Sequence, residues 1–419
     1  MSRAGLQPKR TLVVLGASSD QLFLIRTARR MGLSVLAVDR NPDSPGFLET
    51  EDTAVISTRD VPALIAYLER RRAEGLDLAG VLTMGSDIPD VVAALAAHFG
   101  LPGPSIETAR LATDKLAMKQ RFVERGVPCP WFAEVRSLAE LRSLIGTRGP
   151  RLVLKPVDRS GSRGVFLLDG TSDLAELHAR ARDFSYTGRV MVEEYLAGPQ
   201  ISTETVLYDD SAVTPGFADR NYELLERFRP RVMENGGWIP SRCTPEQRAE
   251  VEALVTAAAW ALGLRRGIAK GDVVLTPDGP RVIEIAARLS GGDFCESLVP
   301  LGTGVNYVRS AIEIAIGAEP DFSALVPTAE RAVANRYFFP EPGVLVAVHG
   351  VERVRAQPWV KKLELWYRPG DVVPPSLSHA HRFGVFVIVA RDREELERRV
   401  RWVYDTVRIE TRAVAAASA

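Results

Sequence analysis

Two acidic residues flank a predicted turn in the second half of the chain. The sequence Thr-Pro-Asp-Gly at 276–279 is a strong turn signal between two apolar runs, so an antiparallel hairpin is predicted there. A type I turn followed by a glycine bulge sets Thr276 opposite Pro280. Counting outward then sets Asp272 opposite Glu284. We therefore expect the two carboxylates to share one face of the sheet.

Paired carboxylates on one sheet face indicate a bound cation or a solvated surface. Like charges directly opposite each other destabilise a sheet by roughly 0.2–1 kcal/mol. A divalent cation reverses that sign, because Mg²⁺ at nucleotide sites binds a few carboxylates and completes its shell with phosphate and water. A hairpin whose acids simply sit in water accounts for the spacing equally well. The period of two along the second strand adds Ala286 and Arg288 to the face of Glu284.

A lysine at the end of a predicted strand over 152–157 precedes a loop that is rich in serine and glycine. Glycine lets backbone N–H groups approach a phosphate closely, and Lys155 supplies a point charge. The loop lacks the Walker spacing and no helix follows it, so it is not a P-loop. A plain turn between strands is the alternative. The residues that enter the prediction are Ser160, Gly161, Ser162 and Gly164, with Val165 where the next strand begins.

A third segment, 191–200, runs from an apolar strand into acidic residues and a Gly-Pro turn. Backbone groups at such a strand exit can bind the edge of an adenine, and a side chain there can hold ribose hydroxyls. Taken alone, this pattern is the weakest of the three signals.

Taken together, in this order and spacing, the three segments resemble the ATP-grasp superfamily of carboxylate–amine ligases. The resemblance spans nearly the whole chain. Residues 12–39 are similar to the family's N-terminal Rossmann-like domain, and residues 113–119 to its first lysine motif. Residues 290–292 and 303–306 resemble its substrate-side turn and the helix that follows.

The resemblance implies ATP and Mg²⁺ as cofactors, with two magnesium ions and Mn²⁺ as a substitute metal. It implies that Lys115 and Lys155 contact the α- and β-phosphates beneath a mobile lid over 160–164. It also implies that Asp272 and Glu284 bind the metal. The strand exit would line the adenine and the ribose with Glu193, Glu194, Tyr195, Leu196 and Gln200.

Three catalytic roles follow from the same resemblance. Arg288 would hold the transferring phosphoryl group. Glu204 falls where relatives often place an acid near the substrate. Lys270 stands two residues before the first metal carboxylate, where relatives often have a histidine.

Two departures from the family pattern bear on activity. Gln200 replaces the usual ribose glutamate, which removes a charge but keeps an acceptor. Ala286 replaces the asparagine of the usual Glu-x-Asn-x-Arg pattern, so one metal ligand is lost. The peptide-bond-forming branch related to bacterial L-amino-acid ligases tolerates a small residue there, and the resemblance is therefore closest to that branch.

The elements that must position these residues follow an α/β pattern. With 419 residues, 46% of them hydrophobic and 25% charged, the chain has ordinary globular composition and room for several domains. An N-terminal Rossmann-like parallel sheet is predicted by alternating strand and helix signals at 11–15, 33–38, 61–74, 78–83 and 88–99. One long helix is expected over 105–125. An ATP-grasp fold, α+β in its ATP-binding part, is expected to follow.

Further elements are predicted in the second half. Thr244 opens the clearest helix, with proline next and Gln247 three residues after the cap, and the helix should run to 263. Strands are expected near 332–338, 344–348, 362–366 and 384–390, before a helix over 393–407. The domains predicted are the Rossmann-like domain at 1–110, a lid-bearing subdomain at 111–197, a catalytic core at 198–330 and a C-terminal α/β part on the substrate side at 331–419.

Composition argues against several classes of partner. Lys+Arg and Asp+Glu both total 53, which gives no overall electrostatic case for a nucleic acid or an anionic membrane. The apolar stretch at 91–97 falls far short of the ~20 residues of a membrane span. No charged-then-apolar leader opens the chain and the three cysteines are scattered, which favours a cytoplasmic protein. A homodimer is the default expectation.

Two other patterns have plainer interpretations. Asp39 after the second strand hints at dinucleotide binding, but the loop after the first strand has one glycine where Gly-x-Gly-x-x-Gly needs three. A Rossmann half that packs and forms part of the substrate side is therefore preferred. His379 and His381 form a candidate metal pair, but without a nearby carboxylate a loop in water is the preferred interpretation.

The predicted function is an ATP-dependent ligase that joins a carboxylate, an amino acid or a related small acid, to an amine through an acyl phosphate. ADP and phosphate are the other products, and both substrates are small molecules. The first alternative is a bicarbonate-phosphorylating enzyme of the purine or biotin-carboxylase type. The second is a non-catalytic nucleotide-binding protein.

Overall fold

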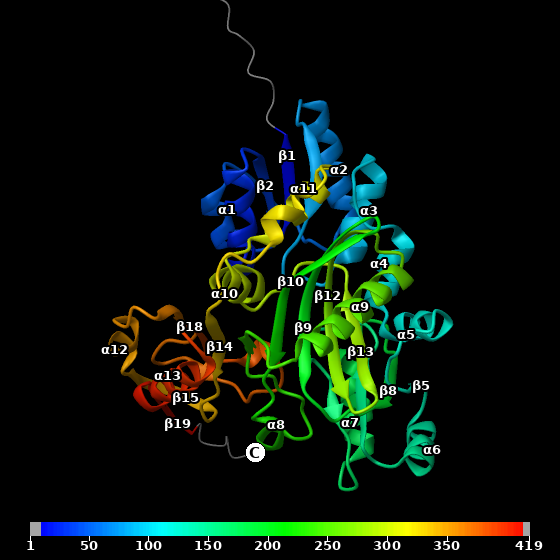
Figure 1. Ribbon diagram of the computed structural model, residues 1–419, viewed down its shortest axis with the longest axis vertical. Coiled ribbons are helices and arrows are strands. Elements are labelled where there is room, and N and C mark those ends of the chain that lie inside the picture. The colour runs from blue at the N-terminus through cyan, green and yellow to red at the C-terminus, as the bar shows by residue number, and fades with distance from the viewer. Residues whose placement is uncertain (1–9, 414–419) are drawn as a thin grey trace, which may run out of the picture.

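The computed structural model describes residues 10–413, which form four β-sheets with helices packed around them (Figure 1). The N-terminal part lies at the top of the view, the C-terminal part at the lower left, and a small sheet at the lower right. Long central strands join these three regions. Between residues 10 and 413, no helix combines the length and the apolar character that crossing a membrane would require.

The N-terminal sheet is parallel throughout, in the order β3-β2-β1-β4, which confirms the Rossmann-like prediction. Only one residue of its third strand is buried, so this strand gave no apolar run and was not predicted. The elements are β1 (Thr11–Leu15), α1 (Leu22–Arg30), β2 (Ser34–Asp39), β3 (Asp52–Val55), α2 (Val61–Ala73), β4 (Leu78–Leu82) and α3 (Pro89–Phe99), with 3₁₀ turns at Ser19–Gln21 and Pro45–Glu49.

A helix from much later in the chain, α11 (Tyr307–Ala315), packs against this sheet. A Cβ atom on Gly80 of β4 would lie 2.3 Å from the carbonyl oxygen of Ala315, so only glycine allows this close approach. One hydrophobic core therefore joins the N-terminal sheet to the central part of the molecule.

The single helix predicted over 105–125 is wrong in one respect, because it is two helices, α4 (Ile106–Thr113) and α5 (Lys115–Glu124). Asp114 between them has an extended backbone, and its carboxylate accepts the N–H groups of Leu116 and Ala117. Asp114 is thus the N-cap of the second helix. The break places Lys115 at the start of α5, where its own N–H donates to the carbonyl of Val157.

The small antiparallel sheet has the order β5-β8-β6-β7 and carries the serine- and glycine-rich loop between β6 and β7. Ser137 caps its first helix by accepting the N–H of Glu140 at 3.2 Å. The elements are β5 (Phe132–Val135), α6 (Leu138–Arg148), β6 (Leu152–Pro156), β7 (Phe166–Leu167), α7 (Leu174–Phe184) and β8 (Val190–Glu194).

The central sheet has eight strands in the order β13-β12-β9-β10-β11-β14-β18-β16. Thr244 and Gln247 form the predicted capping box at the start of α9. The elements up to residue 330 are β9 (Gln200–Tyr208), β10 (Ser211–Arg220), α8 (Leu225–Phe228), β11 (Gly237–Ile239), α9 (Pro245–Ala261), β12 (Arg266–Thr276), β13 (Gly279–Ala286), α10 (Val299–Thr303) and α11, with short turns η3 (Phe294–Leu298) and η4 (Phe322–Leu325).

The predicted hairpin is confirmed as β12 and β13, although its register is set differently. The turn pairs Thr276 with Gly279, one residue earlier than predicted. An extra residue in β13, Ile283, then shifts the register by one beside the acidic pair. Asp272 consequently still lies opposite Glu284. The bulge that makes this pairing lies next to the carboxylates instead of at the turn.

The C-terminal part continues the central sheet and adds a three-stranded sheet, β17-β15-β19. Its predicted strands and its last helix are confirmed. The predicted boundary between residues 330 and 331 falls between strands of one sheet, and the division into four domains stays a prediction. The elements are β14 (Ala332–Phe338), β15 (Gly343–His349), α12 (Val351–Arg355), β16 (Val360–Leu365), β17 (Val372–Val373), the 3₁₀ turn η5 (His379–His381), β18 (Gly384–Ala390), α13 (Arg393–Thr406) and β19 (Arg408–Arg412).

Candidate active site

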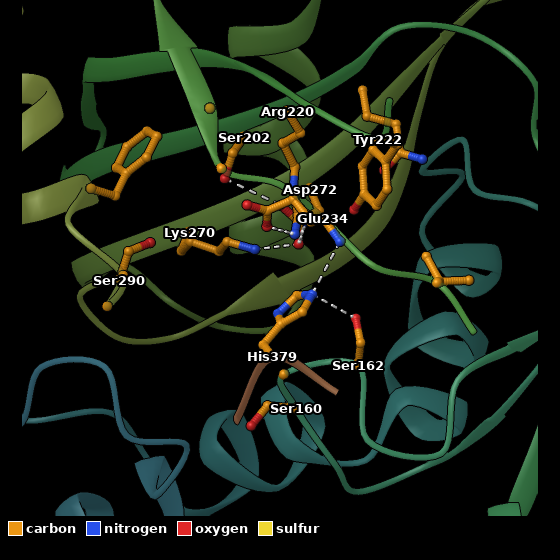
Figure 2. A pocket seen from close by; sticks show the side chains of 18 of the residues that line it. Ser160, Ser162, Ser202, Arg220, Tyr222, Glu234, Lys270, Asp272, Ser290 and His379 are labelled. Atoms are coloured by element: carbon orange, nitrogen blue, oxygen red, sulfur yellow. Dashed lines mark hydrogen bonds and ion pairs between the residues drawn. The ribbon is translucent and has the colours of Figure 1, made fainter. Parts of the chain in front are cut away.

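The β6–β7 loop, the hairpin and the C-terminal part border a cavity of about 710 Å³, seen from close by in Figure 2. Three residues predicted for the site are not on its wall: Lys115, Gly164 and Glu204. The other predicted residues all line it, namely Lys155, Ser160, Gly161, Ser162, Val165, Glu193, Glu194, Tyr195, Leu196, Gln200, Lys270, Asp272, Glu284 and Arg288.

Asp272 is buried on the cavity wall among hydrogen-bond donors (Figure 2). Arg220 Nη1 lies 2.7 Å from Asp272 Oδ2, and Lys270 Nζ contacts the same oxygen. Ser202 Oγ donates to Oδ1 at 3.2 Å. Arg220 also pairs with Glu234, at 2.6 Å. Sequence reasoning missed Arg220, because an arginine at the end of an apolar strand belongs to no motif.

Glu284 pairs with Lys115, which does not line the cavity. Lys115 Nζ lies 3.4 Å from Glu284 Oε2 and donates to the carbonyl of Arg159 at 2.8 Å. Burial opposes ionisation of Glu284, but the ammonium of Lys115, aided by Lys270, holds the pKa of that carboxyl well below its usual range. Lys115 therefore reaches the predicted metal carboxylate, and its contact with a phosphate stays a prediction.

A buried group of one acid and two lysines lies at the exit of β8. Lys155 Nζ is 2.5 Å from Glu193 Oε1, and Lys119 Nζ is 2.9 Å from Glu193 Oε2. Burial lowers the pKa of Lys155, whereas the two ammonium groups overcome burial and lower the pKa of Glu193. The sequence analysis did not assign Lys119 to the site. Its spacing of four from Lys115, which puts both lysines on one helix face, was the available signal.

Asp272 and Glu284 are the two carboxylates predicted to hold a magnesium ion. Over the described part of the chain, His, Cys, Asp and Glu side chains form no group of three or more that could hold a metal. The two carboxylates lie opposite each other on the cavity wall, and the cations that now contact them show that the site needs positive charge. Ala286 adds no oxygen ligand, so this donor set fits Mg²⁺ when phosphate and water complete its shell.

Arg288 is oriented by the N-terminal part of the molecule. Its Nε lies 2.5 Å from Asp87 Oδ1, in the loop that follows β4. Burial opposes the charge of Asp87, but the guanidinium of Arg288 outweighs it and lowers the pKa of Asp87 to about 2. Asp87 was not predicted. Its position after a strand of a parallel sheet, where ligands and site residues gather, was the signal.

Glu204 does not face the cavity. Its side chain is fully buried, and Oε1 accepts the N–H of Ser290 at 3.0 Å. Burial raises the pKa of Glu204 to about 7. The acid therefore lies beneath the wall, where it holds the predicted substrate-side turn at 290–292, and its direct contact with a substrate stays a prediction.

The preference for a water-exposed histidine pair is wrong for His379. Figure 2 shows its ring pointing toward the β6–β7 loop, and Ser162 Oγ lies 3.1 Å from His379 Nε2. His379 also lines the cavity with Arg382, whose guanidinium lies 3.6 Å from the ring centroid of Tyr337. The sequence could not indicate this, because the loop that packs on His379 lies 217 residues away.

Another part of the cavity is lined by Asp20, Asp293, Glu364 and Lys362, and Glu296, which is outside the lining, pairs with the same lysine. We call these five residues the acid-rich wall. Lys362 Nζ lies 2.9 Å from Asp293, 2.7 Å from Glu296 and 3.6 Å from Glu364. Burial raises the pKa of Glu296 to about 7. Burial and the charge of Asp293 raise the pKa of Asp20. This wall carries more acid than its lysine can neutralise, so it favours a positively charged group of a ligand.

The alternative of dinucleotide binding finds no support in the loop after β1. The carboxylate of Asp39 accepts the N–H groups of Ala17 and Asn41, at 2.8 and 3.0 Å. A Cβ on Gly16 would lie 2.9 Å from the Gln21 side chain, which occupies the space beside the loop. Asp39 thus holds its own loop in place.

Comparisons with known protein families agree with this geometry. Residues 112–292 match the ATP-grasp domain, and residues 336–412 match the L-amino acid ligase C-terminal domain 2. Together they confirm the ATP-grasp prediction and its predicted branch.

Individual proteins extend the similarity. The uncharacterized protein y4rH of Sinorhizobium fredii is 27% identical over 398 residues, which are 93% of this chain and 80% of that protein. The L-arginine-specific L-amino acid ligase of Bacillus subtilis is 24% identical over 288 residues, 68% of each chain. The crystal structure of an L-amino acid ligase from Bacillus licheniformis matches with a TM-score of 0.83 at 23% identity, covering 97% of this chain and all of that one. At that identity it shows the shared fold.

Proposed function

We propose that this chain, an ATP-grasp carboxylate–amine ligase with the C-terminal domain of the L-amino acid ligases, joins two amino acids or closely related small molecules. One substrate supplies a carboxylate and the other an amine, and ATP is consumed to ADP and phosphate. The observation that carries the proposal is the cavity wall itself. Asp272 and Glu284 lie opposite each other there, with Lys155 and Arg288 on the same wall.

The reaction proceeds in two balanced steps. A carboxylate oxygen of the first substrate bonds to the γ-phosphorus as the bond from that phosphorus to ADP breaks, which gives an acyl phosphate. The amine nitrogen of the second substrate then bonds to the acyl carbon as the carbon–oxygen bond to phosphate breaks. The amine loses a proton, and an amide and phosphate remain. Neither step needs a covalent nucleophile on the protein, because alignment and charge stabilisation supply the rate.

The residues divide the work by position. Lys115 and Lys155 hold the α- and β-phosphates, and Arg288, oriented by Asp87, holds the phosphoryl group in transfer. Asp272 and Glu284 would hold two magnesium ions, with Mn²⁺ as a substitute, and the metal would offset charge on the phosphates. The adenine and the ribose are proposed to contact residues at the exit of β8, namely Glu193, Glu194, Tyr195, Leu196 and Gln200, all of which line the cavity.

The charges of the cavity also support the choice of substrates. Arg382 lies on the cavity wall against Tyr337 and suits the carboxylate of an amino acid. The acid-rich wall suits an ammonium group. An amino acid carries both charges, so these two regions together favour it over bicarbonate, which has no cation. We further propose that the enzyme acts in the cytoplasm as a homodimer.

One experiment separates this function from its alternatives. ADP release is measured against a matrix of amino acids, dipeptides and small acids, and any amide is identified by mass spectrometry. An amide formed in proportion to ADP supports the proposal. ADP release that depends on bicarbonate alone indicates the carboxylase-type alternative. ATP binding without turnover over the whole matrix indicates the non-catalytic one.

A further inference from the structure

The β6–β7 loop meets the C-terminal part at the 3₁₀ turn η5. The N–H of His379 donates to the carbonyl of Gly161 at 3.2 Å, and Ser162 Oγ lies 3.1 Å from His379 Nε2 (Figure 2). Both loop residues and His379 line the same cavity. Two segments 217 residues apart therefore close over the cavity through one backbone and one side-chain contact.

The direction of the side-chain hydrogen bond follows from the other partner of the ring. The backbone N–H of Glu234 also points at His379 Nε2, at 3.4 Å. A backbone N–H can only donate, so Nε2 is an acceptor and the ring proton is on Nδ1. The hydroxyl of Ser162 is therefore the donor to His379.

The surroundings keep this ring neutral. The charged groups that face it are Glu234 and the guanidinium groups of Arg163, Arg220 and Arg382. Burial, together with these three cations, holds the pKa of His379 well below its usual range despite the opposing charge of Glu234. A neutral histidine can accept the hydrogen bond from Ser162 throughout the physiological pH range.

The other end of η5 is anchored to the cavity wall. Arg382 donates from its backbone N–H to the carbonyl of His379 at 3.4 Å and from Nη2 to the carbonyl of Glu234 at 2.7 Å. On the loop side, Ser162 has a φ of 56°, in the left-handed region that non-glycine residues rarely adopt. A serine in that conformation needs a partner to hold it, and His379 provides one.

We propose that His379 is a positioning residue that holds the loop 160–164 closed over the triphosphate by accepting a hydrogen bond from Ser162. The proposal rests on the proposed function, in which a closed loop keeps water away from the acyl phosphate. When the contact is lost, ATP is held less tightly and part of the acyl phosphate is hydrolysed. The signature is uncoupling, in which more ADP forms for each amide made.

The test compares two substitutions of the histidine. His379→Leu removes the acceptor, and we expect the KM for ATP to rise about fivefold and the ratio of ADP to amide to rise above one. His379→Gln keeps an acceptor at a similar distance from the backbone and should restore both values toward wild type. His381→Leu is the matched control, because its ring contacts Ser378 and does not line the cavity.

A second variant covers the case in which His379→Leu fails to fold. Ser162→Ala removes the donor from a half-buried loop and should give the same rise in KM and in the ratio. The double variant Ser162→Ala/His379→Leu should be no worse than either single one. Unchanged KM and ratio in folded His379→Leu would overturn the proposal, as would equal effects of the leucine and glutamine variants.

Failure of this proposal is distinguishable from failure of the proposed function. If the wild-type protein makes no amide from any pair of amino acids, the proposed function fails. ATP affinity measured by titration calorimetry on wild type, His379→Leu and His379→Gln then still tests whether His379 holds the loop over the nucleotide. Equal ATP affinities in these three proteins would by themselves overturn the proposal that His379 holds the loop over the nucleotide.

Discussion

At the hairpin the two opposed carboxylates, Asp272 and Glu284, each have at least one cation of their own, whereas on the acid-rich wall one lysine serves three carboxylates. Glu284 has Lys115, and Asp272 has both Lys270 and Arg220. Lys362, by contrast, is shared among Asp293, Glu296 and Glu364. The same residue types thus prepare two regions of one cavity for opposite charges.

This difference indicates how the cavity orients its ligands. Under the proposed function, phosphates would neutralise the cations near the hairpin, and an ammonium group would neutralise the acids on the other wall. The field of the protein would then draw each ligand to its own region before any hydrogen bond forms. Substitutions that alter one region should leave the binding of the other region's ligand almost unchanged.

The largest effect is expected at the hairpin. Glu284→Gln removes a proposed metal ligand and leaves Lys115 without its acid, so ADP formation should fall by about 10³-fold or more with every substrate pair. Coupled assay of ADP release measures it, and circular dichroism checks the fold. Asp278→Asn, an exposed acid in the turn of the same hairpin, should have no effect. Turnover near wild type in Glu284→Gln would show that Glu284 does not bind the metal.

A smaller loss is expected at Arg288. Arg288→Gln removes the group proposed to hold the transferring phosphoryl, so kcat should fall by about 10²-fold while the KM for ATP changes little. Steady-state kinetics with varied ATP measures the two values separately. Arg281→Gln, in the strand β13 that precedes Arg288, is the control. A rise in KM with unchanged kcat would show that Arg288 binds ATP in the ground state instead.

Among residues 10–413, no lysine or arginine pairs directly with Glu204, and its effect should appear in stability. Its pKa of about 7 in the folded protein lies above the usual 4.5, so the folded state binds the proton more tightly. The stability that the folded state gains from binding this proton is complete below about pH 4.5 and is lost as the pH rises through about 7. Glu204→Gln should therefore raise Tm by a few degrees at pH 8 and hardly at all at pH 5. An equal shift in Tm at pH 5 and pH 8 would contradict the raised pKa of Glu204 in the folded protein.

The smallest effect is expected on the acid-rich wall. Asp20→Asn removes one of four acids, so the KM for the amine substrate should rise a few-fold while the KM for ATP stays constant. Initial rates with each substrate varied in turn test both halves of the statement. Asp43→Asn, at an exposed position of the N-terminal domain, is the matched control. If Asp20→Asn changed only the KM for ATP, the acid-rich wall and the hairpin would not bind separate ligands as proposed.

Much of the fold was predictable because its signals are local. The buried strand β1, the capping box of α9 and the hairpin β12–β13 each depend on residues a few positions apart. The hairpin also carried the acidic pair, since a period of two and a tight turn define which residues share a face. The family resemblance then extended these local signals to the lysines and to Arg288.

The remainder was decided by the tertiary structure. Asp87, Arg220 and His379 each reach the site from a different part of the chain, and none of them stands in a recognisable motif. The break at Asp114 was also hidden, because an aspartate between two helical stretches reads as part of one helix until its carboxylate caps the second. Periodicity and turn chemistry describe neighbours along the chain. Strand order, helix packing and the burial of charge determine which distant residues meet, and those contacts built the cavity.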